Sequence, residues 1–300
     1  DGTNGGFVWF KAGSSVRTTT AANITVSGGN VADLTALAAS GNATGMTTTM
    51  GNGVTLDAVS LSSYGGNITV RGKSAASVTT YAGSDGAAIS NANGIRAHGS
   101  VNLDAGAGKL SLWGYSQSSS GSSNGIELSA SGTSVYQSAS AASDAITIED
   151  TAANSAAADV WGIYMWNSSS IMASNGGGIA ITGSAAKHSA LVIPSGSAVL
   201  STGGPISLTG KAYGGAFNAV DIGGHVGLKA GVNTGASTSN ITIVGNKFAF
   251  TGSVASSGVL SIKPYTTGAS MGLGSGSGTV ALTSSWFSGS SVFKDGFSGM

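Results

Sequence analysis

The residues that could carry out acid–base chemistry in this chain form one small acidic group, Asp144, Glu149 and Asp150. Enzymes that cleave polysaccharides place paired carboxylates, or a carboxylate and a basic residue, across their substrate. Glu149 alternates with Ile146 and Ile148, so an inward-facing pair of isoleucines would turn Glu149 toward solvent. The pattern therefore favours a solvated face, although a groove that held Asp144, Glu149 and a basic partner would support an enzyme.

Other catalytic and metal-binding patterns are weak. Ser270 lies in the stretch Gly-Ala-Ser-Met-Gly, which matches the nucleophile elbow of α/β-hydrolases. Gly and Ser are frequent enough here to produce that match by chance, and no strand–helix alternation surrounds it. The three histidines, His98, His188 and His225, have no regular ligand spacing, and the chain has no Cys. We therefore expect no catalysis, no metal ion and no cofactor.

Four aromatic residues are better candidates for a surface that binds or assembles. Trp113 and Tyr115 alternate with leucines at 110 and 112, and Tyr164 and Trp166 alternate with apolar residues at 163 and 165. If the apolar residues face inward, all four rings face outward. Outward rings on a flat β surface can stack on sugars or pack against a neighbouring fibre. The alternative is that the loops of the same units fold over the rings.

The elements that would position these rings are short strands that recur along the chain. The stretch 203–231 holds three of them, which begin at Ile206, Val220 and Val226. Apolar residues two apart, cut off by Gly, are typical of short strands. The first strand recurs at intervals of 27 to 42 residues, beginning at Ile68, Leu110, Ile146, Ile179, Ile206 and Ile241. Such uneven intervals indicate loops of different lengths between similar strands.

The second strand recurs in the same order within each unit. Its outward positions are Arg96, Glu127, Tyr164, Val192 and Asp221. Arg96 above Glu127 would make an exposed ion pair between neighbouring coils, which contributes at most about 1 kcal/mol to stability. Two strands that recur in register are difficult to obtain by chance.

These repeats predict an all-β fold, a right-handed parallel β-helix (β-solenoid) of about ten to twelve coils with irregular loop insertions. One coil alone cannot bury its apolar face, but coils stacked ~4.8 Å apart close both the core and the backbone ladder. We expect less regular coils in 1–63, clear repeats in 64–251, and continuing coils in 252–300 of a chain that is longer than this segment.

Composition agrees with a folded repeat array. The chain has 50 Gly in 300 residues, yet 41% of its residues are hydrophobic and they fall in periodic strands, which argues against disorder. Its formal net charge is zero. A neutral chain lacks the overall charge that attracts nucleic acid or anionic membranes, so we expect no nucleic-acid partner.

The units GGNITVRGKS, AGKLSLWGYS and GGPISLTGKA, together with the C-terminal tail from VLSIKPYTTG to FKDGFSGM, resemble the repeat region of filamentous-haemagglutinin-like exoproteins of Gram-negative bacteria. The resemblance covers roughly residues 64–300. It implies a very long β-helix at the cell surface or outside the cell, exported by a dedicated outer-membrane partner in two-partner secretion. Many such proteins serve in adhesion or biofilm.

We therefore expect a non-catalytic segment of a secreted or cell-surface filament that acts in adhesion or biofilm. Its partners would be host or matrix glycans or proteins, and the chain would also associate with itself end to end or laterally. Two alternatives stay open. The first is a self-assembling structural fibre, sheath or matrix subunit, and the second is a carbohydrate-active β-helix enzyme.

Overall fold

The computed structural model describes most of the 300 residues. The described residues are 6–27, 43–44, 51–75, 81–82, 88–89, 92–116, 122–129, 132, 134–152, 159–166, 168–213, 216–227, 238–288, 292–293 and 297–299. Within them the regular secondary structure is almost entirely β-strand, and the one helical element is the short 3₁₀ turn η1 (Ser284–Phe287).

Three parallel sheets contain nearly all the strands, and we call them sheets A, B and C. Sheet A consists of β1 (Val8–Phe10), β5 (Val54–Asp57), β10 (Ile95–His98), β13 (Ser122–Ser129), β16 (Asp159–Met165), β19 (Leu191–Ile193), β22 (Val220–Ile222) and β25 (Phe248–Phe250). Sheet B consists of β2 (Ser15–Arg17), β6 (Ser60–Ser62), β11 (Asn102–Asp104), β14 (Ser134–Ser138), β17 (Ser169–Ala173), β20 (Ala198–Ser201), β23 (His225–Gly227) and β26 (Ser253–Ala255). Sheet C consists of β3 (Ile24–Val26), β7 (Ile68–Lys73), β12 (Leu110–Ser116), β15 (Ile146–Ala152), β18 (Ile179–Ala185), β21 (Ile206–Ala212), β24 (Ile241–Val244) and β27 (Leu260–Lys263), and β4 (Ala43–Thr44) also pairs with β7.

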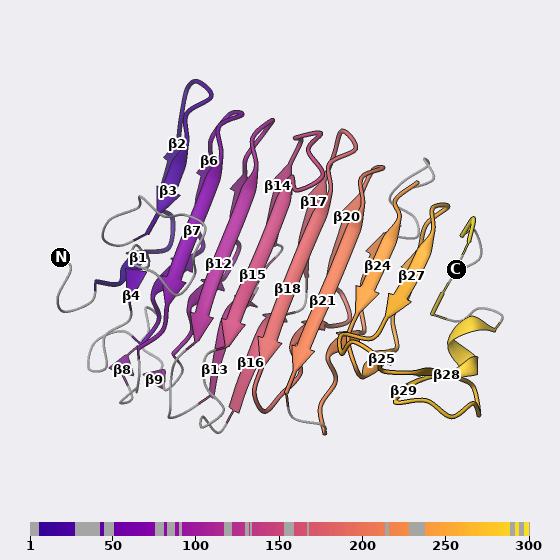
Figure 1. Cartoon of the computed structure of the whole chain (residues 1–300). Coiled ribbons are helices and arrows are strands. Elements are labelled where there is room, and N and C mark those ends of the chain that lie inside the picture. The colour runs from indigo at the N-terminus through magenta and orange to yellow at the C-terminus, as the bar shows by residue number, and fades with distance from the viewer. Residues whose placement is uncertain are drawn as a thin grey trace.

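The chain visits sheets A, B and C in turn and then moves one position along all three, which makes a parallel β-helix. Figure 1 shows the successive strands of one face side by side, from the N-terminal end to the C-terminal end of the stack. The described strands make eight three-stranded coils, fewer than the ten to twelve expected. The shortfall arises because the short apolar runs near the C-terminus do not each extend the three sheets.

Register follows the repeats read from the sequence. The first residues of the sheet C strands stack on one another in parallel pairs, as the column Ile68, Leu110, Ile146, Ile179, Ile206 and Ile241. Each of these side chains is buried, and burying one of this size stabilises the fold by about 1.5–3 kcal/mol. The next residue along each strand is only partly buried and faces outward.

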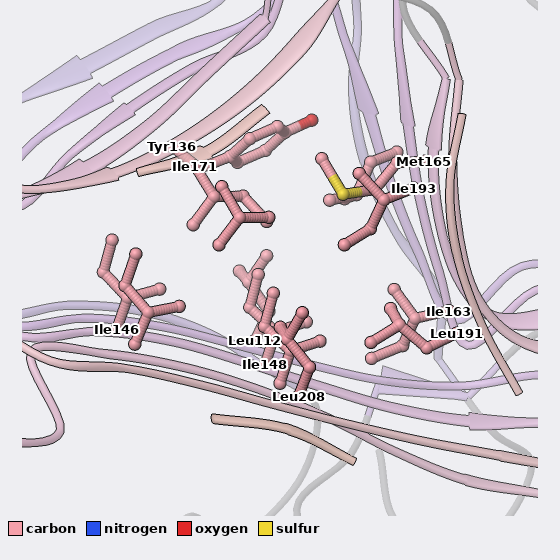
Figure 2. Packing of buried hydrophobic residues seen from close by; sticks show 14 of the residues in the cluster. Leu112, Tyr136, Ile146, Ile148, Ile163, Met165, Ile171, Leu191, Ile193 and Leu208 are labelled. Carbon is pink, nitrogen blue, oxygen red and sulfur yellow. The ribbon is translucent and has the colours of Figure 1, made fainter. Parts of the chain in front are cut away.

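The core is a narrow stack of apolar side chains enclosed by the three sheets. In Figure 2, Leu112, Ile148 and Leu208 of sheet C point toward Tyr136 and Ile171 of sheet B, with apolar residues of sheet A alongside. Tyr136 differs from these apolar side chains because it carries a hydroxyl group. This hydroxyl is buried and has no hydrogen-bond partner among the described residues. Burial raises the pKa of Tyr136, an effect that the Ser134 hydroxyl opposes.

Glycine is the fifth residue of the sheet C strands β7, β12, β18 and β21, and these strands run one or two residues beyond it before the chain turns toward sheet A. A Cβ on Gly210 would overlap the carbonyl of Ala219, and one on Gly72 would overlap the carbonyl of Gly94. These glycines are needed because the next strand's backbone approaches closely. Asp150 holds the same position in β15, paired with Gly114. Its side chain fits because it lies over Gly125, where a Cβ would occupy the same space.

The two ends of the chain differ from the middle. Residues 1–63, expected to be less regular, contain the first complete coil, β1 to β3, in register with β5 to β7. In 252–300, β26 and β27 complete the eighth coil. Two residues near the C-terminus then form isolated parallel bridges to this coil, Phe293 with Val254 of β26 and Gly299 with Val259 just before β27. The last two strands, β28 (Met271–Leu273) and β29 (Val280–Leu282), pair with each other in a separate two-stranded sheet.

Two further features complete the description. The strands β8 (Tyr81–Ala82) and β9 (Ala88–Ile89) form an antiparallel pair apart from the three sheets. Near the C-terminal end, the Phe250 ring lies 4.8 Å from Trp286 and 5.3 Å from Phe293. The described part of the tail therefore packs aromatic side chains against the last coil.

Candidate functional site: an aromatic surface on sheet A

The outer face of sheet A carries one column of side chains from five successive coils. Strand pairing places Arg96, Glu127, Tyr164, Val192 and Asp221 at equivalent positions, as the sequence predicts. Because the residues on either side of each are buried in the core, the members of this column face away from it. Tyr164 stands in the middle of the column.

Five rings from three successive coils contact one another around Tyr164, and we call them the aromatic platform: Trp161, Tyr164, Trp166, His188 and Phe217. Tyr164 lies 5.0 Å from Trp166 and 6.0 Å from Trp161, measured between ring centroids. Trp161 stacks on His188 at 4.0 Å with an interplanar angle of 18°, and His188 lies 4.6 Å from Phe217. Trp166 is 47% exposed and Phe217 is 37% exposed, so both ends of the platform are open to solvent.

Two kinds of element place these rings. Tyr164 and Trp166 face outward because they alternate with the buried residues Ile163 and Met165. Trp161 precedes Gly162 at the corner where β16 begins. His188 and Phe217 come from the loops that lead from sheet C to sheet A in the next two coils, after β18 and β21. Stacking of coils therefore brings together rings that are up to 56 residues apart in the sequence.

Carboxylate and amide groups flank the platform. On one side, Glu127 accepts hydrogen bonds from the side-chain amides of Asn93 at 2.7 Å and Asn124 at 3.2 Å, and lies 3.6 Å from the Arg96 Nε atom. On the other side, Asn218 donates to Asp221 at 3.2 Å. The ion pair of Arg96 and Glu127 is thus present, but the expectation that it is exposed is wrong for Glu127, which is 6% exposed. The two asparagines explain this, because they enclose its carboxylate.

Burial and these charges change the acidity of the groups at the platform. Burial raises the pKa of Tyr164, and the negative charges of Asp221 and Glu127 raise it further. Burial also raises the pKa of Asp221, against the effect of the Asn218 amide. Tyr164 therefore keeps its hydroxyl proton well above neutral pH and can donate a hydrogen bond.

A groove of about 500 Å³ adjoins the platform at Phe217. One wall comes from the last coils, at Phe217, Asn246, Lys247 and Phe248, and the other wall comes from the tail, including Trp286. The lining combines aromatic rings with an amide and an ammonium group. Such a lining suits a ligand that has both apolar and hydroxyl-bearing faces.

The four rings singled out from the sequence fall on two different sheets. Tyr164 and Trp166 belong to the platform, whereas Trp113 and Tyr115 lie on β12 in sheet C. Trp113 and Tyr115 face outward and are half-buried. Side chains of the preceding strand cover them, since Arg71 lies 5.0 Å from the Trp113 ring and the Lys73 Nζ atom 5.3 Å from the Tyr115 ring.

The acidic residues at 144–150 lie in three different environments. Asp144 is exposed and pairs with Lys109 at 2.7 Å, which holds the pKa of Asp144 below its ordinary value. Glu149 faces outward on sheet C and is half-buried. Asp150 is fully buried at the corner. Burial raises the pKa of Asp150 well above its ordinary value, although the Ser184 N–H donates to its Oδ2 atom at 3.3 Å.

The remaining residues considered from the sequence, His98, His225 and Ser270, each contact a polar side chain of a neighbouring strand or loop. His98 lies 3.6 Å from an oxygen of Asp57, and His225 shares a hydrogen bond of 2.6 Å with Ser253. Ser270 contacts Thr279 at the start of the separate sheet. Within the described part of the chain, no group of three or more His, Cys, Asp or Glu residues could hold a metal ion. No helix in that part is long and apolar enough to cross a membrane.

Sequence reasoning missed three members of the platform. Trp161 begins a Trp-Gly-Ile unit, and the equivalent units of the two preceding coils begin with Asn93 and Asn124. A Trp where the other units have Asn could have indicated that Trp161 belongs to the aromatic surface. His188 and Phe217 lie in loops, so strand alternation gave no information about them.

Comparisons with known proteins add no relative. No family model matches the chain, and searches of curated proteins and of solved structures find no match. The case for function therefore depends on the geometry of the chain itself.

Proposed function

We propose that this chain is a non-catalytic segment of a long extracellular or cell-surface filament that adheres to glycans. The observation that carries the proposal is the aromatic platform, five contacting rings that are open to solvent at both ends. Exposed aromatic surface on a folded protein marks a place of interaction. Hydroxyl donors and amide or carboxylate groups beside the rings suit a sugar, which is apolar on its faces and hydroxylated at its edges.

The resemblance of the repeats to filamentous-haemagglutinin-like exoproteins supports the same proposal. Under it, the rod works in adhesion or biofilm, outside a Gram-negative cell, after export by an outer-membrane partner. The eight stacked coils provide a stiff scaffold on which a row of side chains keeps a fixed spacing.

The platform suits binding better than glycoside hydrolysis. Glu127 and Asp221 are three coils apart in one column, so their Cα atoms are separated by about 14 Å at a strand spacing of ~4.8 Å. Two-carboxylate glycosidases hold their carboxyl groups roughly 5–9.5 Å apart, so both side chains would have to extend along the column toward each other to reach that separation. Glu127 is also engaged by Asn93, Asn124 and Arg96.

A glycan array followed by titration calorimetry tests this proposal. Trp166→Ala and Tyr164→Ala should each weaken binding by about fivefold, since stacking of one sugar on a ring contributes on the order of 1 kcal/mol. The matched control is Tyr115→Ala, an outward ring on sheet C. Full binding by both platform variants would refute the assignment, and loss of binding by Tyr115→Ala alone would move the site to sheet C.

A self-assembling structural fibre is the second candidate, and one observation favours it. Among the described residues, β1, β2 and β3 are the end strands of the three sheets. Unpaired strand edges are templates for pairing with another chain. Negative-stain electron microscopy over a concentration series distinguishes the two. Single rods of constant length support the adhesin, and filaments that lengthen with concentration support the fibre.

A further inference from the structure

The charges of this neutral chain are separated along its length. Residues 1–159 contain six basic and ten acidic residues, a net charge of −4. Residues 160–300 contain six basic and two acidic residues, a net charge of +4. The coils stack in sequence order (Figure 1). Among the charged side chains that the structure describes, the first half is balanced, with six basic and six acidic residues, and the second half is basic, with four basic residues and one acidic residue. The aromatic platform begins where the basic half begins.

Lysines of the basic half recur at one corner of the rod, where each sheet C strand ends and the chain turns toward sheet A. Lys187 follows β18, Lys211 lies near the end of β21, Lys247 precedes β25, and Lys263 ends β27. Lys187, Lys211 and Lys247 thus belong to three successive passages around the same corner, whereas Lys263 lies at the end of the last sheet C strand, where it pairs with Val244. The spacing of the coils separates the three lysines at this corner by about 5 Å per coil along the rod axis. They occupy different positions along the turn, because Lys211 pairs with Ser184 and Lys187 follows three residues later.

The ammonium groups at this corner are available to an anion. Lys187 and Lys247 are exposed. The Lys247 Nζ atom donates to the carbonyl of Ala216 at 2.6 Å, which leaves two of its three N–H groups for a ligand. The Lys211 Nζ atom lies 5.6 Å from the Tyr265 ring centroid. Within the described residues none of these lysines forms an ion pair.

The lysines lie beside the platform. Lys187 precedes His188, which stacks on Trp161. Lys247 bonds to Ala216, the residue before Phe217, and it also lines the groove at the end of the platform. Flat apolar rings and the cations of three successive coils therefore run along the same edge of the rod.

We propose that this corner binds an acidic polysaccharide that carries carboxylates on its sugar units. The proposal rests on the proposed glycan-binding function and specifies its ligand class. One cation per coil matches a chain with about one negative charge per sugar, and the rings accept the sugar faces. The Asn218 amide and the Tyr164 hydroxyl offer hydrogen bonds to sugar hydroxyls, which a phosphodiester backbone lacks.

The test compares polygalacturonate with its fully methyl-esterified form, which has the same backbone without charge. Calorimetry or biolayer interferometry should give at least tenfold tighter binding of the acid form at 50 mM salt. Raising salt to 200 mM should weaken binding of the acid form alone, because ion pairing at an exposed surface is screened. The variant Lys187→Gln/Lys211→Gln/Lys247→Gln should bind both forms equally.

Controls keep the outcomes separate. Lys11→Gln/Lys73→Gln/Lys109→Gln makes the same change of charge in the first half and should bind like the unchanged chain. Lys247→Gln alone, an exposed position, gives a second test if the triple variant folds poorly.

Equal binding of the acid and ester forms, unaffected by the lysine variants, would overturn this inference and leave the glycan platform intact. Failure of both forms to bind would also overturn this inference, and the glycan array would then decide the glycan-binding function separately. The inference would also be overturned if the chain bound dextran sulfate or single-stranded DNA but did not bind polygalacturonate. It would be overturned as well if sedimentation showed concentration-dependent self-association that the triple lysine variant abolishes.

Discussion

Asp150 offers the sharpest test of how the corner of this β-helix is built. Its carboxyl is fully buried, one oxygen accepts a 3.3 Å bond from the Ser184 N–H, and the other has no partner among the described residues. Burial favours the neutral acid and raises the pKa of Asp150 well above its ordinary value, with the Glu149 charge adding to the effect. We predict that Asp150→Asn makes the rod more stable at neutral pH.

The size of the effect follows from proton linkage. An unfolded aspartate ionises near pH 3.9, whereas the folded chain keeps the Asp150 proton to a higher pH. Within that window the folded state binds one proton more than the unfolded state, so stability falls as pH rises. The fall is about 1.4 kcal/mol for each pH unit and ends when pH passes the folded-state pKa. Below about pH 4 the contribution of Asp150 is fully present.

Urea unfolding followed by circular dichroism, at several pH values from 4 to 9, measures this window. The difference in free energy of unfolding between Asp150→Asn and the unchanged chain should grow with pH by about 1.4 kcal/mol per unit and then level off. Asp144→Asn serves as a comparison, because the pKa of Asp144 is shifted in the opposite direction from that of Asp150. The pKa of Asp144 is lowered by Lys109, so that its small contribution is lost as pH falls. Parallel stability curves for Asp150→Asn and the unchanged chain would show that Asp150 is ionised in the fold.

Two further predictions concern the core. Tyr136→Phe should leave the free energy of unfolding unchanged or raise it by up to about 1 kcal/mol, because the buried hydroxyl has no hydrogen-bond partner among the described residues; a loss above about 2 kcal/mol in urea unfolding would reveal an unseen partner. Ile146→Ala should cost about 2–5 kcal/mol, since it leaves a cavity between Leu110 and Ile179. Thr147→Ala, on the outer face of the same strand, should stay within about 0.5 kcal/mol, and equal losses for the two variants in the same assay would contradict the assigned register.

The strand repeats could be predicted because they depend on local pattern. Alternation of apolar and polar residues decides which side of a strand faces inward. The recurrence of Ile68, Leu110 and Ile146 then predicted the column that the pairing shows. The described residues contain eight coils where ten to twelve were predicted, because β28 and β29 have a strand's composition but pair only with each other. Composition does not say which edge a strand will pair with.

The binding surface was only half predictable. Strand alternation found that Tyr164 and Trp166 face outward, but it gave Trp113 and Tyr115 equal weight. The difference between the two pairs arises from their neighbours. Arg71 and Lys73 lie over Trp113 and Tyr115, whereas Tyr164 and Trp166 contact each other and Tyr164 also contacts the Trp161 ring. The division of charge between the halves of the chain was readable from the sequence, whereas the alignment of its lysines on one corner was not.

The sequence by itself determined the all-β class, the strand positions and the side of each strand that faces the core, because these depend on residues one or two positions apart. The tertiary structure decided which loops meet, and so it joined Trp161, His188 and Phe217 into one surface with Tyr164. It also decided that Glu127 and Asp150 are buried and Asp144 exposed. The physical reason is that coil stacking fixes contacts between residues about 30 positions apart, through loop lengths that no local pattern encodes.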